Sequence, residues 1–466
     1  MSYKALSAFA RKNEAAVADV RFTDLWGTWH HISIPMSRVR DALCDGIGYD
    51  GSSIRGYQPI EASDMVLRID TQAPYFMDPF TEHRTLVLFA DSYNPGNEGE
   101  YGKDPRTVAK RTERFLTQSG IADTAFFGPE AEFFIFDNVE FVMNDGKPCL
   151  KAYSEEFESE GQNHGHAQRR KASYFPLLPD RLHDIRTAIM LKLEDAGIKT
   201  EAHHHEVARA QNEIDLRYDR LTSMADYLQV FKNFVANEAR ARGKTTTFME
   251  KPLPDDNGSG MHTHQSLWRN STPLFAGKEY AGLSRQALWY IGGLNEHACA
   301  LAPIISQNVR AYERYMPGFE APNLARGFSA RNRSAPNRIA VYSDAPEAKR
   351  VEFRPPGPTC NPYLAFSAML MAGLDGIQKR TDPGKPLEKD FYHITEGEQE
   401  EYGLVTMPSS LGEALGALEK DHDFLVQGGV WTEDLLDAFV AEKKREIEHA
   451  EREPLEALRL CYSYGI

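Results

Sequence analysis

The chain has 466 residues, of which 41% are hydrophobic, 26% charged and 11% aromatic, a composition typical of a soluble globular protein with two or three domains. Its 53 basic and 68 acidic residues give a net charge of -15, which argues against nucleic acid as a general partner. Five scattered cysteines without a CxxC pair argue against disulfides or zinc, and without an apolar leader or membrane-length segment we expect a cytoplasmic protein that contacts no membrane.

The first hundred residues form short extended segments separated by Gly, Asp, Asn and Pro, which predicts a small β-rich domain over residues 1–103. Asp104 can cap and Pro105 can open a helix that ends near Gly120, so we place the boundary of a second domain, 104–466, at this helix. The extended segments are VADVRF (17–22), LWGTWHHISIP (25–35), MVLRID (65–70) and RTLVLFA (84–90).

The second domain alternates strands with helices, so the fold class is α+β. In the helix expected over 180–197, four apolar side chains share one face and predict a buried stripe: Leu182, Ile185, Ile189 and Leu193. The region 144–173, rich in Glu, Gly, His, Asn and Arg, is typical of a long functional loop. Further helices are expected over 222–243, 284–302, 361–380 and 432–452.

Two glutamates lie two positions apart in GPEAEFFIFD (128–137), a segment that otherwise predicts a buried strand. Side chains two apart in a strand point to the same side, so Glu130 and Glu132 should project together. Two close carboxylates away from water must be protonated, paired with cations or bound to metal. A strand with one wet face explains this segment equally well when it is taken alone.

Three more segments offer metal ligands at comparable spacing. Glu206 and Glu213 flank a short connection, His262 and His264 lie two apart after a glycine-rich turn, and Glu352 alternates with apolar residues in KRVEFRPP. Each pattern alone is ordinary, but together they predict a site of five glutamates and one histidine, which suits Mg²⁺ or Mn²⁺ better than zinc. Such ions stabilise phosphoryl transfer.

An arginine-rich stretch supplies positive charge. Residues 326 to 354 contain seven basic and three acidic side chains, a local net charge of +4 in an acidic chain. Guanidinium groups bind carboxylates and phosphates bidentately, so the stretch predicts an anion-binding surface, although a solvated basic segment is the alternative. The sequence contains neither a P-loop nor a GxGxxG fingerprint, so metals and arginines would have to hold any nucleotide.

Eight motifs in order over nearly the whole chain resemble glutamine synthetase of the bacterial type I class. They are DGSSIRGY (50–57), GPEAEFF (128–134), HHHEVARAQNE (203–213), NGSGMHTHQSL (257–267), MPGFEAP (316–322), SARNRSAPNR (329–338), KRVEFRPPGPTCNPYL (349–364) and MAGLDGI (371–377). The resemblance implies a small N-terminal β-grasp domain, a large catalytic α/β domain with an antiparallel sheet of metal-bearing strands, and a homo-oligomer, a dodecamer of two hexameric rings with active sites between subunits.

The resemblance further implies ATP-dependent ligation of ammonium to the γ-carboxylate of L-glutamate through γ-glutamyl phosphate. Asp50, Glu320 and Arg333 would be catalytic: Asp50 of an adjacent subunit takes a proton from ammonium, and Glu320 lies on a closing flap. Matched by motif, Glu132, Glu206 and Glu213 would hold one Mg²⁺ or Mn²⁺ ion, and Glu130, His262 and Glu352 the other. Ser53, Tyr174 and Glu206 would complete the ammonium pocket. Glutamate would contact Asn257, Gly258, Arg314, Arg333 and Arg354, and ATP would contact Glu201, His264, Ser266 and Arg338.

Several positions depart from the family pattern. Ala172 and Ser173 replace two glycines, Glu250 replaces a proline, Glu347 replaces a lysine and Gly357 replaces an aspartate. These changes lie near the amine and nucleotide sites, so two alternatives stay open: a γ-glutamyl ligase for a larger amine such as a polyamine or ethanolamine, and a catalytically silent nitrogen-sensing paralogue. The presence of all six metal ligands counts against the silent paralogue.

One tyrosine is a candidate for covalent modification. Tyr392 in KDFYHITEGE falls near a tyrosine that some type I enzymes adenylylate, although the surrounding residues match poorly and the tyrosine of a loop needs no such role.

Overall fold

The computed structural model describes residues 3–96, 99–157, 167–178, 180–315 and 321–464. A small mixed sheet forms the N-terminal part, with strand order β2-β1-β6-β4-β3 and β5 paired to β6. β1 and β6 are parallel, and the other pairs in this sheet are antiparallel. Its strands are β1 (Val17–Thr23), β2 (Trp29–Pro35), β3 (Ile47–Asp50), β4 (Asp64–Ile69), β5 (Tyr75–Met77) and β6 (Thr85–Tyr93), and its helices are α1 (Tyr3–Lys12) and α2 (Val39–Asp45).

The small sheet packs on both faces because β6 is apolar on both. Leu86 and Leu88 point into a small core that includes Leu6 of α1, whereas Val87 and Phe89 point into the main core of the chain. Alternate residues of a strand face opposite sides, so this one strand contributes to two cores. The sheet is therefore anchored to the rest of the molecule by apolar burial as well as by its connecting chain.

Two further sheets carry most of the residues of interest. A seven-stranded sheet has the order β13-β7-β15-β19-β18-β17 with β16 paired to β15, and a four-stranded sheet has the order β11-β12-β8-β14. β7 and β8 are consecutive and separated only by Glu132, so the two sheets meet at that residue. The strands are β7 (Thr124–Ala131), β8 (Phe133–Phe136), β11 (Thr200–His205), β12 (Gln211–Leu216), β13 (Asp219–Arg220), β14 (Thr245–Thr247), β15 (Met261–Arg269), β16 (Thr272–Pro273), β17 (Phe328–Ala330), β18 (Asn337–Ile339) and β19 (Val351–Phe353).

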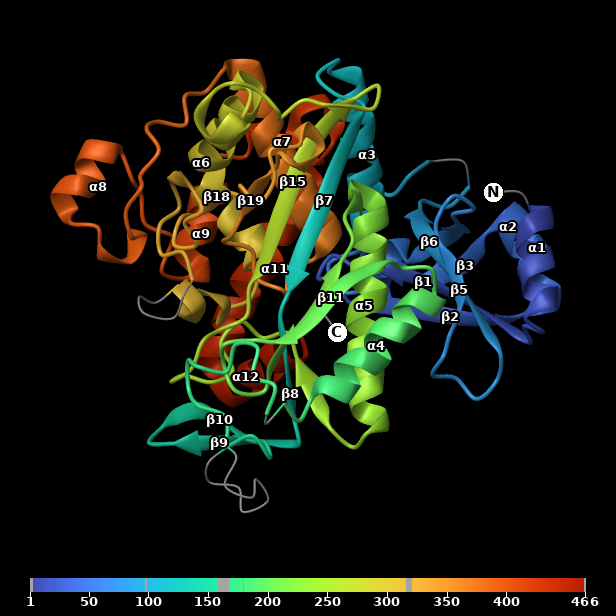
Figure 1. Cartoon of the computed structure of the whole chain (residues 1–466). Coiled ribbons are helices and arrows are strands. Elements are labelled where there is room, and N and C mark those ends of the chain that lie inside the picture. The colour runs from blue at the N-terminus through green and yellow to red at the C-terminus, as the bar shows by residue number, and fades with distance from the viewer. Residues whose placement is uncertain (1–2, 97–98, 158–166, 179, 316–320, 465–466) are drawn as a thin grey trace.

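Helices cover these sheets. Figure 1 shows α3 (Pro105–Gln118) and α5 (Leu221–Ala241) between the small sheet and the long strands β7 and β15. α7 (Pro362–Lys379) is buried along almost its whole length and stacks Phe366 on Phe127 of β7, with ring centroids 4.9 Å apart. The remaining helices are α4 (His183–Asp195), α6 (Arg285–Ile305), α8 (Glu396–Tyr402), α9 (Leu411–Leu418), α10 (Asp423–Val426), α11 (Glu433–Arg452) and α12 (Pro454–Ser463).

The structure confirms the α+β class and the six helices expected in the second domain, each within a few residues of its predicted ends. The side chain of Asp104 caps α3 by accepting a hydrogen bond from the backbone N–H of Thr107 at 2.6 Å. The boundary between residues 103 and 104 falls in the connection from β6 to α3 and stays a prediction. None of the described helices is long and apolar enough to cross a membrane.

One expectation was wrong in part, and one helix was not expected. The region 144–173 is not one long loop, because β10 (Lys147–Tyr153) pairs with β9 (Asn138–Asn144) in an antiparallel hairpin. Alternating intermediate and exposed residues leave this hairpin without the apolar periodicity that identifies a buried strand. α1 was not expected either, since its ten residues bury only Leu6 and Ala10.

Candidate active site

The pairing of three neighbouring strands places acidic and imidazole side chains side by side. His262 on β15 is directly opposite Glu130 on β7, and His264, two residues along, is opposite Glu352 on β19. Residues two apart in a strand share a face, so these four side chains project from the same face of the sheet.

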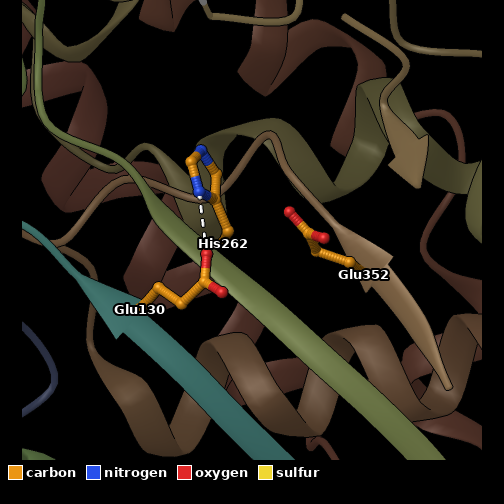
Figure 2. Close-up of side chains that lie close together, drawn as sticks. All are labelled: Glu130, His262 and Glu352. Atoms are coloured by element: carbon orange, nitrogen blue, oxygen red, sulfur yellow. Dashed lines mark hydrogen bonds and ion pairs between the residues drawn. The ribbon is translucent and has the colours of Figure 1, made fainter. Parts of the chain in front are cut away.

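Glu130, His262 and Glu352 lie close enough to hold one metal ion. Each offers a ligand atom, and these atoms lie within 4.8 Å of one another. His262 Nδ1 is 3.2 Å from Glu130 Oε2, and Figure 2 shows this bond with the Glu352 carboxylate on the neighbouring strand. His264 Nε2 lies 2.8 Å from the other Glu130 oxygen.

A second group of ligand atoms lies on β11 and just after it. Glu206 follows the last residue of β11, and His204 on β11 is paired with Glu213 on β12. The His204 imidazole bridges the two carboxylates, with 3.6 Å from Nδ1 to Glu206 and 3.6 Å from Nε2 to Glu213. Ligand atoms of all three lie within 4.8 Å, so this group could hold a second ion.

Glu132, expected to share an ion with Glu206 and Glu213, occupies the junction between β7 and β8. Its carboxylate accepts hydrogen bonds from Gln211 Nε2 at 2.7 Å and from the backbone N–H of Gly260 at 3.1 Å. It lines the same cavity as Glu130, His204, Glu206, Glu213, His262 and Asp215.

Three of the carboxyl groups resist ionisation. Burial, reinforced by the negative charge of Glu206, raises the pKa of Glu132 well above its ordinary value. Burial and the charge of Glu130 do the same for the pKa of Glu213. Burial raises the pKa of Glu206 to about 7. These acids are therefore short of positive partners, which is the condition in which a divalent cation would bind.

The group of Glu130, His262 and Glu352 is held in the protonation state that binds metal. Burial opposes ionisation of Glu130, but the imidazoles of His264 and His262 hold its pKa well below the usual range. Burial, together with the positive charge of Arg354, lowers the pKa of His262 to about 4, so its imidazole is neutral at pH 7. Burial likewise opposes ionisation of Glu352, yet Arg354 keeps its pKa low. An ionised carboxylate and a neutral imidazole are the forms that bind metal.

A cavity of about 370 Å³ connects these acids to arginines. Arg338 and Arg354 each form an ion pair with a different oxygen of the Glu352 carboxylate. Arg314 is 2% exposed and donates through Nη1 to the carbonyl of Pro355 at 2.8 Å and through Nη2 to that of Arg354 at 3.1 Å. The predicted residues that border this cavity are Tyr174, Asn257, Gly258, Arg314, Arg333, Arg338 and Arg354.

A second cavity of about 410 Å³ opens on the other side of Glu130, which borders both spaces together with Asp215. Glu201, His264 and Ser266, expected at the nucleotide, lie in its wall. Its apolar part is aromatic: Phe126 meets the rings of Tyr218 and Trp268 edge to face at 5.4 and 5.7 Å. A planar aromatic ligand could cover these rings.

Some predicted residues lie elsewhere. Arg338, expected at the nucleotide, lines the first cavity and not the second. Asp50 and Ser53 lie on the small sheet and its following turn, outside the residues that line either cavity. Glu320 lies outside the described residues. Tyr392 borders a separate depression of about 980 Å³ beside Arg333, and its hydroxyl is buried without a hydrogen-bond partner among the described residues.

Sequence reasoning missed several residues of the two cavities, of which four lie beside predicted site residues. Asp215 lies two positions from Glu213 on β12, so the spacing rule could have identified it, whereas His204 is brought beside Glu213 by the pairing of β11 with β12. Arg350 donates from Nε to His264 Nδ1 at 3.2 Å, and this contact depends on a strand pairing that no local pattern reveals. Trp268 also shares a strand face with Ser266, and its indole N–H donates to the Ser266 hydroxyl at 3.2 Å.

A third group, Glu296, His297 and Asp375, also has ligand atoms within 4.8 Å of one another. Here both imidazole nitrogens are already bonded, Nε2 to Asp375 at 2.9 Å and Nδ1 to Asp421 at 2.8 Å, and Lys379 lies 2.9 Å from Asp375. The group is supplied with positive charge by the protein itself, which is the arrangement of a structural ion-pair network.

Two family models match the chain. The model described as "Glutamine synthetase, catalytic domain" matches residues 102–460, and the one described as "Glutamine synthetase, beta-Grasp domain" matches residues 14–95. Together they account for both parts of the fold.

Individual proteins agree with these matches. A glutamine synthetase of Aquifex aeolicus is 47% identical over 443 residues, covering 94% of each chain. A 3-hydroxylaminophenol mutase of Cupriavidus pinatubonensis is 45% identical over 446 residues, again covering 94% of each chain. The cryo-EM structure of Plasmodium falciparum glutamine synthetase superposes with a TM-score of 0.87 at 27% identity, covering 97% of each chain.

Proposed function

The chain belongs to the glutamine synthetase family and is an ATP-dependent glutamate–ammonia ligase, and on this premise we propose which of its residues carry the reaction. An oxygen of the L-glutamate γ-carboxylate attacks the γ-phosphorus of ATP, and ADP leaves. Ammonia then attacks the γ-carbonyl carbon of γ-glutamyl phosphate, phosphate leaves with the C–O bonding electrons, and the nitrogen gives a proton to the departing phosphate to become the amide. Phosphorylation is needed because an unactivated carboxylate oxygen is a poor leaving group at neutral pH.

One observation carries the assignment of roles: Glu130 and Asp215 border two cavities, an arginine-lined one of about 370 Å³ and an aromatic-lined one of about 410 Å³. We assign glutamate to the arginine-lined cavity and the nucleotide to the aromatic-lined cavity. The phosphoryl group would then pass between them at the metal-ligating side chains, over the short distance that in-line transfer requires.

The donor set fits a pair of Mg²⁺ or Mn²⁺ ions, because it consists of carboxylates with few imidazoles and no thiolate. Glu130, His262 and Glu352 would hold one ion, and Glu206 and Glu213, with Glu132 or His204, the other. Such ions, when bound, neutralise phosphate oxygens in the transition state. Gln211 and the Gly260 amide fix the Glu132 carboxylate toward this space.

The arginines bind the two acidic substrates. Arg314 and Arg354, with Asn257 and the backbone of Gly258, would hold glutamate in the first cavity. Arg333 is exposed at the rim of that cavity and would stabilise the charge on the phosphoryl group during transfer. Arg338 pairs with Glu352, so it would orient that ligand and reach the nucleotide phosphates from the metal side.

The ammonium site would be completed by a neighbouring subunit. Asp50 is exposed, and the hydroxyl and backbone N–H of Ser52 hold its pKa below the usual value, so it is an ionised proton acceptor at neutral pH. Donated with Ser53 into a neighbour's cavity, it would face Tyr174 and Glu206 and take a proton from ammonium, since only neutral ammonia attacks. Glu320 would close over the intermediate and exclude water.

This arrangement requires an oligomer with sites between subunits, and a dodecamer of two hexameric rings satisfies it. A domain boundary between residues 103 and 104 leaves Asp50 and Ser53 in the donated domain. The five cysteines are all free thiols, which supports a cytoplasmic location. Modification of Tyr392 stays part of the proposal, on the condition that its buried hydroxyl turns outward.

A larger amine is the second candidate substrate. Tyr174 and Phe175 stack at 4.0 Å beside the cavity and remain 54% and 60% exposed. Aromatic faces next to carboxylates attract organic ammonium ions, so this pair could cover the carbon chain of a polyamine or ethanolamine.

Phosphate release by the purified protein tests both candidates. With ATP, Mg²⁺ and L-glutamate present, ammonium should support the fastest release, and ethanolamine or a polyamine at equal concentration should give little. If ethanolamine or a polyamine gives faster phosphate release than ammonium, that amine is the substrate in place of ammonium. Release that requires neither amine nor ammonium would contradict the proposal.

A further inference from the structure

A buried carboxylate outside both cavities fills space that a glycine leaves. Glu250 follows β14, and its side chain is wholly buried against Gly357, in the loop after β19. A Cβ placed on Gly357 would overlap the Glu250 carboxylate oxygen and lie 2.7 Å from its Cγ and 3.0 Å from its Cδ. Real Cβ atoms do not approach other atoms this closely, so the Glu250 side chain in this position requires glycine at 357.

The Glu250 carboxylate ties together two other loops. It accepts one hydrogen bond from Asn308 Nδ2 at 2.9 Å and a short one from the Thr359 hydroxyl. Asn308 Nδ2 also donates to Thr359 Oγ1 at 2.9 Å, which closes a ring of three side chains. Such a closed buried network fixes the relative positions of the segments that supply it.

The backbone of Glu250 supports the loop that holds the proposed glutamate contacts. Its carbonyl accepts a hydrogen bond from the N–H of Ser259 at 2.8 Å, and a side chain at Gly258 would overlap that carbonyl. Asn257 and Gly258 are therefore placed directly against the main chain of Glu250. A shift of Glu250 would move this loop with it.

The opposite wall of the glutamate cavity depends on the same residue. Gly357 follows Pro355 and Pro356, whose carbonyls accept hydrogen bonds from Arg314 Nη1 at 2.8 and 3.3 Å. Thr359 continues this segment. The Glu250 carboxylate thus lies between the loop of Asn257 and the segment that anchors Arg314.

Both positions also depart from the pattern that the sequence resembles, which has proline at 250 and aspartate at 357. A carboxylate on residue 357 would start where the Glu250 carboxylate ends. The two departures therefore remove a carboxylate from one loop and return it to the same space from the other.

We propose that Glu250 is a positioning residue for glutamate binding and that Glu250 and Gly357 form a coupled pair, in which one carboxylate, from either position, sets the spacing of the two loops. The proposal rests on the assignment of glutamate to the first cavity. It predicts that substitutions at the two positions are strongly non-additive.

The test compares Gly357→Asp, Glu250→Ala and the double variant in the full-length enzyme. Gly357→Asp places two carboxylates in one space and should raise the KM for glutamate by about 10- to 100-fold, because displacements near 1 Å have such effects. Glu250→Ala leaves Asn308 and Thr359 without their acceptor and should raise the KM for glutamate by about 10-fold. In the double variant the aspartate can accept both hydrogen bonds, so the KM should return to within about threefold of wild type.

Two measurements separate positioning from a general loss of structure. The KM for ATP should change by less than about twofold in each single variant, because Asn257, Gly258 and Arg314, whose positions depend on Glu250, do not line the nucleotide cavity. Glu250→Gln keeps the shape and one acceptor, so it should bind glutamate more tightly than Glu250→Ala. If a single variant is too unstable to assay, the stabilisation of its melting temperature by glutamate gives the same comparison.

The outcomes also separate this proposal from the assignment of the cavity. If the wild-type enzyme neither uses glutamate nor is stabilised by it, the proposed function fails. If wild type uses glutamate but the double variant is no better than the worse single variant, or if Glu250→Ala leaves the KM for glutamate unchanged, the coupling of Glu250 and Gly357 is wrong.

Discussion

Two buried clusters of charge in this molecule have opposite electrostatic character. One lies between the small sheet and the helices, where Arg106 of α3 is surrounded by aspartates, and the other is the proposed metal-binding group of Glu132, Glu206 and Glu213. Both bury carboxylates that isolated sequence patterns do not distinguish. In the first cluster the protein itself pairs the carboxylates with cations, and in the second it leaves them short of positive partners.

The carboxylates of the Arg106 cluster are paired with cations of the protein itself. Arg106 binds Asp226 through two hydrogen bonds at 2.8 and 2.9 Å, and its third nitrogen reaches Asp70 at 2.8 Å and Asp91 at 2.7 Å. Lys110 adds a second positive charge, 2.6 Å from Asp70. Burial opposes ionisation of Asp70, but these cations hold its pKa far below the ordinary value. The aspartates of this cluster therefore have cationic partners without a bound metal ion.

The proposed metal-binding group of Glu132, Glu206 and Glu213 has the opposite balance of charge. Burial and neighbouring carboxylates raise the pKa of Glu132, Glu206 and Glu213, whose nearest strand and loop neighbours include further acids. Burial of these acids lowers the stability of the folded protein, which is common at functional sites.

The largest effect should come from removing one surplus acid. Glu213→Gln retains the shape of the side chain and deletes a proposed ligand, so activity should fall by about 10³-fold or more, since a lost ion removes several kcal/mol of transition-state stabilisation. The same change removes a carboxyl group whose ionisation burial and its acidic neighbours oppose, so the melting temperature of the metal-free protein should rise. Phosphate release and thermal unfolding in chelator measure the two effects.

The prediction is specific because activity should fall while the melting temperature rises. A simple structural role for Glu213 would lower activity and melting temperature together. Such a parallel loss would end the distinction between the two clusters.

Breaking the neutralised cluster should act on stability first. Asp226→Asn removes the charge that faces Arg106 and leaves a buried guanidinium underpaired, so the free energy of unfolding should fall by about 3–5 kcal/mol. Tyr363, whose hydroxyl donates to Asp226 at 2.6 Å, would lose a charged acceptor as well. Chemical denaturation of the two proteins at one concentration measures the difference.

An exposed ion pair provides the matched control. Glu456 and Arg459 on α12 lie 3.1 Å apart, and both side chains are about half exposed. Glu456→Gln should change stability by less than about 0.5 kcal/mol. Equal effects of the two substitutions would show that burial of the Arg106 cluster carries no special weight.

The His297 network extends the comparison to a titratable cation. Burial opposes protonation, but Asp375 and Asp421 bind both nitrogens and raise the pKa of His297 to about 9. A raised folded pKa gives stability that is complete below about pH 6.5 and lost as the pH rises through 9, about 3 kcal/mol in all. Wild type should therefore lose stability relative to His297→Gln between pH 6.5 and 9.5.

Thermal unfolding at several pH values, with the two proteins side by side, measures this difference. The comparison cancels every other titrating group that the proteins share. A constant difference across that range would show that His297 is not held as a cation.

Sequence periodicity predicted the parts of this molecule that depend on local pattern. The apolar stripe of α4 and the cap of α3 follow directly from residue spacing, and the spacing of Glu130 and Glu132 places both beside one cavity. The α9 and α10 helices were missed because they are short and their burial depends on α6 and α7.

Tertiary contacts account for the rest of the site. The pairing of His264 with Glu352, and of His204 with Glu213, depends on strand register, which local sequence does not specify. Arg106 and Asp226 are 120 residues apart and carry no motif. The Glu250–Gly357 contact appears in the sequence only as two separate departures from the family pattern.

The last prediction is the pH dependence of metal binding. Because burial raises the pKa of Glu206 to about 7, this carboxyl group is partly protonated at neutral pH, and a divalent ion must displace that proton. Mn²⁺ affinity should therefore fall as the pH drops from 8 to 6, by about tenfold per pH unit once the pH is below 7. His262, with a pKa of about 4, stays neutral in this range and adds nothing. Calorimetry in two buffers of different ionisation enthalpy counts the released protons directly. Binding without proton release would mean that the acids are already neutralised like those around Arg106, and the contrast between the clusters would disappear.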